Sequence, residues 1–259
     1  MNHFLNINEV PEHCLLSIID DAKKIKTKRK GMMQGVLDKP TLLDGCIVGL
    51  IFEKPSTRTR ISFDCGIRQM GGKSMILSAQ ELQLANGENI LDTARVLSLY
   101  LDMVLIRTSD ESMLLNLAAN SSIPIINGLT DQSHPCQVMA DIMTFEELKG
   151  SIHGKKVVWV GDGNNVCTSY IHAAVQFRFD LTISSPVEFL PDKSLIEWAK
   201  GSGAKVEVIE DPTKAVHNVD LVVTDTHVSM HDKIDEANLK REVLRDFQVN
   251  KKLMSKAKS

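Results

Sequence analysis

FEKPSTRTRISFDCG, residues 52–66, joins an apolar run to a cluster of hydroxyl and guanidinium side chains. The run before it, 46–52, has the apolar character of a buried strand. The four residues after Pro55 carry the polar groups: Ser56, Thr57, Arg58 and Thr59. The first turn of a helix has unpaired N–H groups and the positive end of the helix dipole, and hydroxyls and guanidinium add donors that suit phosphate oxygens. The stretch therefore predicts a strand-to-helix turn that binds phosphate, because a simple helix cap would account for only one hydroxyl.

The alternation of apolar runs and amphipathic stretches continues along the chain. We expect strands near 46–52, 74–77, 102–107, 123–127, 156–160, 180–184, 205–209 and 220–224. We expect helices near 7–30, 57–70, 89–100, 110–120, 135–148, 165–177, 191–201, 212–217, 235–246 and 250–257. Runs such as 157–160 are apolar at every position, which is typical of parallel strands covered on both faces. The pattern predicts an α/β fold with open parallel sheets flanked by helices.

One predicted helix divides the chain into two series of strands and helices. It has Pro135 in its first turn and Gly150 after its last residue, which are the positions that these residues favour at helix ends. We therefore expect two similar domains, 1–132 and 150–259, joined by a connecting helix over 133–149.

The bulk composition excludes several classes of protein. The chain has 259 residues, 43% of them hydrophobic and 24% charged, and its net charge of −3 argues against a basic surface for nucleic acid or anionic membranes. Its five cysteines are scattered without a CxxC pair, which argues against a disulfide framework or a structural zinc site. No signal peptide is visible, and no apolar run approaches the roughly 20 residues of a membrane span. We expect a cytoplasmic protein.

Two other predicted strands also end in polar side chains. Arg107 closes one of them, and His134 and Gln137 follow another. The carboxyl ends of parallel strands meet at one edge of a sheet, where ligands bind. A lone histidine is more often structural, but together with Arg58 and Arg107 these residues predict a polar pocket for a small phosphorylated molecule.

Two turns in the second half of the chain also carry polar residues. The stretch 161–166, GDGNNV, superficially matches a dinucleotide-binding fingerprint, but Val166 stands where close helix–strand packing requires Gly or Ala, and no acid follows the next strand. We therefore expect this turn to present Asn164 or Asn165 to a polar substrate instead. Asp225, at the end of a later strand, is placed either to pair with an ammonium group or to cap a turn.

Taken together, these motifs resemble those of the transcarbamoylases, the aspartate/ornithine carbamoyltransferase family, and particularly its ornithine branch. The resemblance runs from about residue 4 to the last residue and rests on five motifs: 56–60 (STRTR), 92–97 (DTARVL), 134–137 (HPCQ), 161–165 (GDGNN) and 225–230 (DTHVSM). The Ser-Met pair in the last motif and the absence of an Arg-x-Gln-x-Glu signature favour ornithine over aspartate as the acceptor.

The resemblance implies a role for each motif. The phosphate of carbamoyl phosphate would be held by residues 56–59 of the first motif, and its carbamoyl end by Arg107, His134 and Gln137. The whole set comprises Ser56, Thr57, Arg58, Thr59, Gln83, Arg107, His134, Pro135, Cys136 and Gln137. Gln83 matches a position that reaches the phosphate of a neighbouring subunit, which implies a homotrimer or a multiple of trimers. The ornithine-binding residues would be Asn165, Asp225, Ser229 and Met230.

The implied reaction is attack of the neutral δ-amine of ornithine on the carbamoyl carbon, which gives citrulline and phosphate. It requires neither a metal nor an organic cofactor. Catalysis would come from positioning and from stabilisation of the oxyanion, with Arg58, Arg107 and His134 as catalytic residues and Thr59 as an additional donor. We expect no nucleic-acid or membrane partner.

The chain departs from its family in two places. His227 and His231 replace residues that are usually Trp and Gly around the Ser-Met pair. The sequence also ends at residue 259, before the His-Cys-Leu-Pro motif and a late arginine of the family. Three alternatives therefore stay open: a catalytically silent binding protein, an aspartate carbamoyltransferase and, least favoured, a nicotinamide-dependent dehydrogenase.

Overall fold

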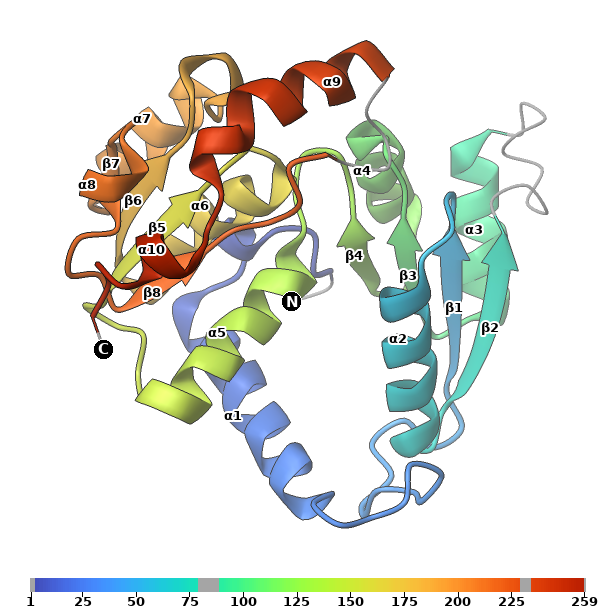
Figure 1. Ribbon diagram of the computed structural model, residues 1–259. Coiled ribbons are helices and arrows are strands. Elements are labelled where there is room, and N and C mark those ends of the chain that lie inside the picture. Colours follow the sequence, from blue (N-terminus) through green and yellow to red (C-terminus); the bar gives the residue numbers. More distant parts are fainter. Residues whose placement is uncertain (1–2, 79–88, 229–233, 259) are drawn as a thin grey trace. The chain divides into compact units, whose positions relative to one another are not determined.

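The structure, a computed structural model, describes residues 3–78, 89–228 and 234–258 (Figure 1). The chain forms two compact units, Met1–Cys136 and Gln137–Ser259. Within the described residues each unit contains one four-stranded sheet, and every strand pair in it is parallel. Helices flank both sheets, so the α/β fold predicted from the sequence is confirmed.

The first unit has the strand order β2-β1-β3-β4. Its strands are β1 (Ile47–Phe52), β2 (Lys73–Ser78), β3 (Met103–Arg107) and β4 (Ile125–Leu129). Its helices are η1 (Ile7–Glu9), α1 (Glu12–Lys28), α2 (Thr57–Gln69), α3 (Ile90–Tyr100) and α4 (Glu111–Asn120), and α5 (Pro135–Lys149) begins at its end.

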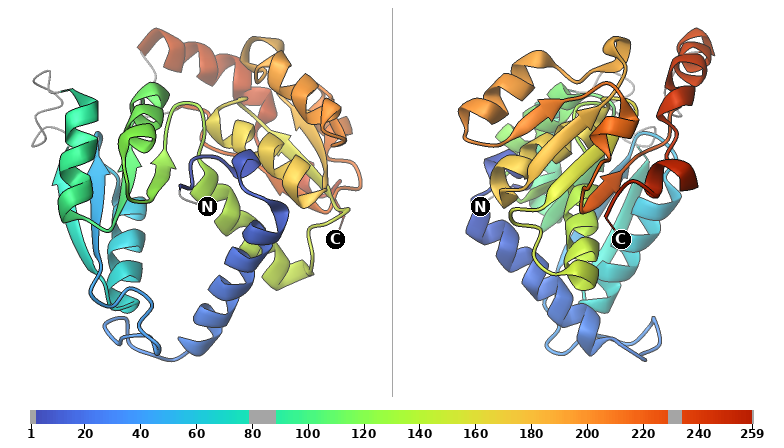
Figure 2. Two further views of the ribbon diagram at one scale, coloured as in Figure 1. Left: turned by 180° about the vertical axis from the view of Figure 1, so that it is seen from behind. Right: turned by 60° about the vertical axis from the view of Figure 1, so that its left-hand side comes forward.

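Successive residues of β1 pack into different cores on the two faces of this sheet. Ile51 joins a cluster with residues of α3 and α4, such as Leu97 and Leu117. Leu50 belongs to a second cluster, which includes Ile67 of α2. The helices accordingly lie on opposite faces of the sheet (Figures 1 and 2). Burial on both faces explains why β1 is apolar throughout.

The second unit has the strand order β7-β6-β5-β8. Its strands are β5 (Lys156–Val160), β6 (Asp180–Ser184), β7 (Val206–Val208) and β8 (Leu221–Val223). Its other elements are α6 (Asn165–Phe177), η3 (Val187–Phe189), α7 (Lys193–Gly201), α8 (Pro212–Ala215), α9 (Ile234–Val243), η4 (Leu244–Phe247) and α10 (Lys251–Met254). Val158 and Val160 of β5 pack against Leu244 and Phe247. Trp159, between them, lies against Tyr170 of α6 with ring centroids 5.8 Å apart.

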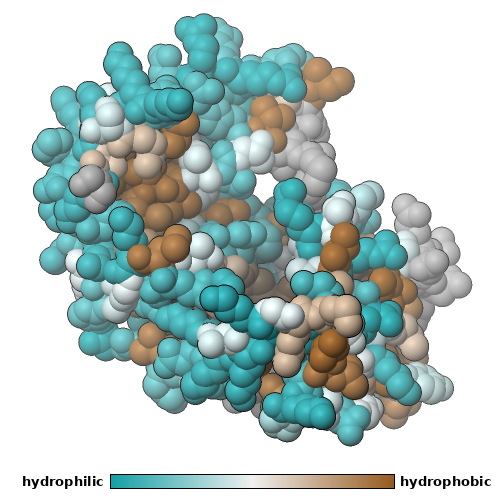
Figure 3. All heavy atoms as spheres, turned by 60° about the horizontal axis from the view of Figure 1, so that its bottom comes forward, coloured by the Kyte–Doolittle hydropathy of each residue, from teal (hydrophilic) through white to brown (hydrophobic). Residues whose placement is uncertain are grey.

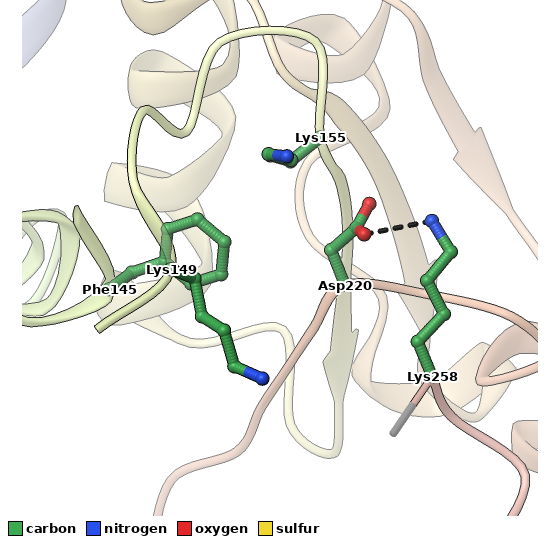
Figure 4. A pocket seen from close by; sticks show the side chains of 5 residues that line it. All are labelled: Phe145, Lys149, Lys155, Asp220 and Lys258. Carbon is green, nitrogen blue, oxygen red and sulfur yellow. Dashed lines mark hydrogen bonds and ion pairs between the residues drawn. The ribbon is translucent and has the colours of Figure 1, made fainter.

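An aspartate just before one strand braces each sheet. Asp102, just before β3, accepts a hydrogen bond of 2.8 Å from the backbone N–H of Ile47 at the start of β1. Asp220, just before β8, accepts bonds of 2.8 Å from the backbone N–H of Lys156 and from Nζ of Lys258 (Figure 4). A cavity of about 140 Å³, lined by this ion pair, two further lysines and a phenylalanine, lies at these amino ends of the strands. It is therefore at the opposite end of the strands from the predicted polar turns.

The predicted elements differ from the observed ones where proline interrupts them. The helix expected over 7–30 is divided into η1 and α1, because Pro11 lacks an N–H and keeps Val10 extended (φ −109°, ψ 129°). The strand expected over 123–127 lies at Ile125–Leu129, after Pro124. Its register against β3 shifts between Ile106 and Arg107, which accommodates the later end.

The surface drawn in Figure 3 is mostly hydrophilic, with apolar side chains gathered in separate patches. Exposed apolar residues of the first unit include Leu99 and Tyr100 of α3, and those of the second include Leu148 of α5. In the part of the chain that the structure describes, no helix is both long enough and apolar enough to cross a membrane.

We predict that a buried histidine makes the second unit sensitive to acid. The ring of His172 on α6 packs edge-on against Trp198 of α7, with centroids 5.5 Å apart, and burial lowers its pKa to about 4. The unfolded chain binds this proton near pH 6.5, so between about pH 6.5 and 4 the free energy of unfolding should fall by up to roughly 1.4 kcal/mol per pH unit. Urea unfolding monitored by tryptophan fluorescence should show that His172→Phe removes this slope. An unchanged slope in the variant would contradict the assignment.

Candidate active site

Three neighbouring strands of the first unit end at one edge of its sheet. Phe52 of β1 pairs with Arg107 of β3, and Arg107 pairs in turn with Leu129 of β4. The turn into α2 therefore follows β1 at the same edge at which β3 ends in Arg107. His134 follows β4 just before α5 begins at Pro135. The structure thus brings together the residues of this unit that the sequence predicts to bind an anion.

The amino end of α2 carries hydroxyl groups that do not cap the helix. Ser56 occupies the N-cap position with extended backbone (φ −145°, ψ 112°), but its side chain makes no capping hydrogen bond. The first turn of any α-helix leaves its N–H groups without partners in the helix. The Ser56 hydroxyl and the first-turn N–H groups are therefore available to an anion at the positive end of the helix dipole.

Two guanidinium groups lie close together beside this turn. Nη1 of Arg107 donates to Oγ1 of Thr59 at 3.1 Å. Burial lowers the pKa of Arg107, and the positive charge of Arg58 lowers it further. Within the described ranges neither arginine forms an ion pair. Two uncompensated positive charges at a helix amino end favour a multiply charged anion such as phosphate.

Glu53 fixes the turn between β1 and α2 against the end of β3. Its backbone N–H donates to the carbonyl of Arg107 at 3.0 Å. Its Oε2 accepts from Oγ1 of Thr108 at 2.8 Å, and from N and Oγ of Ser109 at 2.7 and 3.0 Å. Partial burial alone would raise the pKa of Glu53, but these hydrogen bonds lower it, so the carboxylate stays ionised. Sequence reasoning assigned Glu53 no role, although a carboxylate directly before an anion-binding turn is a signal.

The turn before α5 presents a neutral histidine. Burial lowers the pKa of His134 to about 4, with a further contribution from the charge of Arg107. The imidazole is therefore uncharged at neutral pH and can donate an N–H without a charge of its own. The neighbouring Cys136 thiol donates to the carbonyl of Asn127 at 3.3 Å, and burial raises its pKa to about 12. The Cys136 side chain thus serves the turn as a neutral hydrogen-bond donor rather than as a nucleophile.

The second unit has its own set of polar residues at the carboxyl ends of β5 and β8, which are neighbours in the sheet. Nδ2 of Asn164, after β5, donates to Oδ2 of Asp225, after β8, at 3.1 Å. Oδ1 of Asn164 caps α6 by accepting two backbone N–H groups. Asn165 is the first residue of α6 and lies next to this pair. The structure therefore brings Asn165 and Asp225 to one edge, as the sequence predicts.

Backbone structure alone accounts for the glycines in the turn after β5, without a bound dinucleotide. A Cβ on Gly163 would lie 2.4 Å from the backbone nitrogen of Pro191, and Gly161 has a φ of +129° that favours glycine. Among described residues, no group of three His, Cys, Asp or Glu side chains is arranged to bind a metal.

Asp141 of α5 is a further acidic residue that the sequence analysis did not identify. Its Oδ1 accepts from Nε2 of Gln137 at 2.9 Å, and its Oδ2 accepts from the hydroxyl of Tyr170 at 3.0 Å. Burial raises the pKa of Asp141, and the negative charge of Asp225 raises it further, although both hydrogen bonds oppose the shift. The carboxylates of Asp141 and Asp225 interact electrostatically, and the region that they form favours a cation. The i, i+4 spacing of Gln137 and Asp141 on one helix face could have indicated their contact.

Four residues of the sequence analysis lie outside the described residues: Gln83, Ser229, Met230 and His231. Their expected roles stay predictions.

Comparison with known proteins gives matches over nearly the whole chain. The family models "Aspartate/ornithine carbamoyltransferase, carbamoyl-P binding domain" and "Aspartate/ornithine carbamoyltransferase, Asp/Orn binding domain" match residues 2–147 and 153–259. An ornithine carbamoyltransferase of Roseobacter denitrificans is 55% identical over 258 residues, which cover 100% of this chain and 84% of the relative. That of Cereibacter sphaeroides is 52% identical with the same coverage.

Solved structures agree with these relatives. The ornithine carbamoyltransferase of Pyrococcus furiosus is 41% identical and superimposes with a TM-score of 0.91, covering 99% of this chain and 82% of its own. The anabolic ornithine carbamoyltransferase of Campylobacter jejuni is 34% identical with a TM-score of 0.90, covering 100% of this chain and 84% of its own.

We predict that Arg58→Ala weakens binding of a phosphonate analogue of carbamoyl phosphate by about tenfold to a hundredfold, because a charged hydrogen bond contributes roughly 1.5–3 kcal/mol. Arg58 is exposed, so the unfolding free energy should change by less than about 0.5 kcal/mol. Isothermal titration measures the affinity. Arg60→Ala, an exposed arginine of the same helix, is the matched control and should bind nearly as the parent does. Equal affinities of the Arg58 and Arg60 variants would contradict the assigned site.

Proposed function

The chain belongs to the aspartate/ornithine carbamoyltransferase family, and from this premise we propose that it transfers the carbamoyl group of carbamoyl phosphate to the δ-amine of L-ornithine, giving L-citrulline and phosphate. The observation that carries the proposal is the uncapped amino end of α2 beside two arginines that lack a counter-charge. This arrangement suits a phosphate dianion. The relatives named ornithine carbamoyltransferase do not favour a silent binding protein, an aspartate carbamoyltransferase or a dehydrogenase.

In this proposal carbamoyl phosphate is bound by residues of the first unit and by Gln137 in the first turn of α5. The amino end of α2 and Arg58 hold the phosphate, while Arg107 and His134 donate to the carbamoyl oxygen. The Thr59 hydroxyl accepts from Arg107, which leaves its own hydrogen to donate to the same oxygen. These donors stabilise the negative charge that this oxygen gains when the carbamoyl carbon becomes tetrahedral. Gln137 binds the carbamoyl amide, and Pro135 and Cys136 hold the turn that carries it.

The second unit binds ornithine in the same proposal. Asp225 attracts the α-ammonium group, Asn165 hydrogen-bonds to the amino-acid end, and Ser229 and Met230 complete this contact. The δ-amine attacks in its neutral form: a C–N bond forms, the bond from the carbamoyl carbon to the phosphate oxygen breaks, and phosphate leaves with the electron pair. The attacking nitrogen then gives up one proton, which the leaving phosphate or water accepts. Because a free amine has a pKa of about 10, the δ-amine must lose a proton before it can attack at neutral pH.

Assembly and location are proposed on the family resemblance alone. We propose a homotrimer, or a multiple of trimers, in which Gln83 of one subunit reaches the phosphate site of the next. We place the protein in the cytoplasm.

The direct test of the activity is formation of citrulline by the 259-residue chain from carbamoyl phosphate and ornithine. We expect turnover with ornithine and none with aspartate, because Asp225 and Asp141 would repel the second carboxylate of aspartate, which ornithine lacks. Carbamoyl aspartate as the main product would overturn the choice of acceptor. Binding of carbamoyl phosphate without either product would support the silent alternative.

We also predict the pH dependence of a His134 variant. His134 has a pKa of about 4 and is neutral throughout the range from pH 6 to 9. His134→Gln should therefore lower kcat by about a hundredfold, since one oxyanion donor is weakened, while the acid limb of the rate profile keeps its position. A profile measured from pH 6 to 9 tests this. Disappearance of the acid limb in the variant would mean that His134 titrates in this range and would contradict the neutral assignment.

A further inference from the structure

A buried lysine joins α9 to the turn that follows β5. Lys240 is only 7% exposed, and its Nζ lies 2.9 Å from Oδ2 of Asp162 and 3.3 Å from Oε1 of Glu236. The same ammonium lies 5.8 Å from the ring centroid of Phe189. The Asp162 side chain is also mostly buried, with 12% of its surface exposed. Lysine is rarely buried to this degree unless it is paired.

The burial of this ion pair is not explained by stability alone. Removing two charges from water costs several kcal/mol per ion, and apolar residues of similar volume often stabilise a protein as well or better. A buried charge pair does, however, specify how two elements sit against each other, because displacement of one partner removes a charge contact that a buried group cannot replace with water. The pair therefore fixes the position of the Asp162 turn relative to α9.

The Asp162 turn leads directly to the polar residues of the second unit. The carbonyl of Asp162 accepts from Nε1 of Trp159 at 2.9 Å, and the N–H of Gly163 donates to the carbonyl of Phe189 at 2.8 Å. The next residue, Asn164, donates to Asp225 at 3.1 Å. Lys240 thus pairs with the side chain of Asp162, and two residues further along the same turn Asn164 bonds to Asp225.

We propose that Lys240 is a positioning residue for the acceptor amino acid, which acts through Asp162 on Asn164, Asn165 and Asp225. The proposal rests on the function proposed above. We expect Lys240 to affect the binding of ornithine rather than that of carbamoyl phosphate, since every residue of the connection lies in the second unit. Lys240 also compensates the negative charge of Asp162, whose side chain is mostly buried.

The test compares Lys240→Met with Lys240→Arg, and with Lys258→Met as a matched control. Lys258 forms a 2.8 Å ion pair with Asp220 at the other end of the β8 strand (Figure 4), so its removal breaks a pair of similar length in the same unit. Lys240→Met should raise the KM for ornithine by about tenfold or more, with the Kd of the carbamoyl-phosphate analogue within twofold of the parent. Lys240→Arg should return the KM for ornithine most of the way to the parent value. Lys258→Met should leave both this KM and the Kd of the analogue within twofold of the parent.

A double variant keeps the test decisive if Lys240→Met does not fold. Asp162→Asn combined with Lys240→Met removes both charges, so no unpaired charge is buried. It should fold and still show the raised KM, because the connection between α9 and the turn is lost. The proposal would be overturned if the double variant kept the parent's KM for ornithine, or if Lys258→Met raised this KM as much as Lys240→Met does.

A spectroscopic measurement separates this proposal from the proposed function. In a Trp198→Phe background Trp159 is the remaining tryptophan, and its indole N–H bonds to the Asp162 carbonyl. Lys240→Met should shift the emission of Trp159, and Lys258→Met should not. If the parent chain forms no citrulline, the proposed function fails, but an unshifted emission in Lys240→Met would independently overturn the role of Lys240.

Discussion

The proximity of two like charges, Arg58 and Arg107, is the constraint on which the proposed phosphate-binding site depends. Their guanidinium groups come from the first turn of α2 and the last residue of β3, and neither has a counter-charge in the described structure. Such an arrangement is unfavourable until an anion arrives, so the fold must hold it. Glu53 does so, because its backbone and carboxylate together bond to three consecutive residues at the end of β3. The anion then gains binding energy from a site that is already organised.

The two units have opposite electrostatic character at their polar edges. The first offers helix N–H groups, hydroxyls and two arginines, while the second offers Asp141 and Asp225, of which the former has a raised pKa because of burial and the neighbouring charge. One edge suits a phosphate and the other an ammonium group. This division matches a reaction between an anionic donor and an amine acceptor. His134 stays neutral at this edge, because an additional positive charge beside Arg107 would be unfavourable.

Much of the fold could be predicted because buried parallel strands are apolar throughout: 156–160 and 180–184 have the predicted bounds. Proline explains the main differences, at Pro11 and Pro124. The meeting of the polar turns at one edge could also be predicted, since turns after adjacent parallel strands share an edge. The bonds that organise it could not be predicted, because Glu53 and Ser109 are 56 positions apart and no local pattern pairs them. Asp141 was missed for a related reason: its neighbours Tyr170 and Asp225 come from distant elements.

The most direct test of the account is a crystal structure of the protein with a phosphonate analogue of carbamoyl phosphate. We predict that the phosphonate oxygens lie within hydrogen-bonding distance of the first-turn N–H groups of α2, the hydroxyls of Ser56 and Thr57, and the guanidinium of Arg58. The carbonyl oxygen of the analogue should face Arg107 and His134. A phosphonate bound away from the amino end of α2 would contradict the central claim that this helix terminus is the phosphate site.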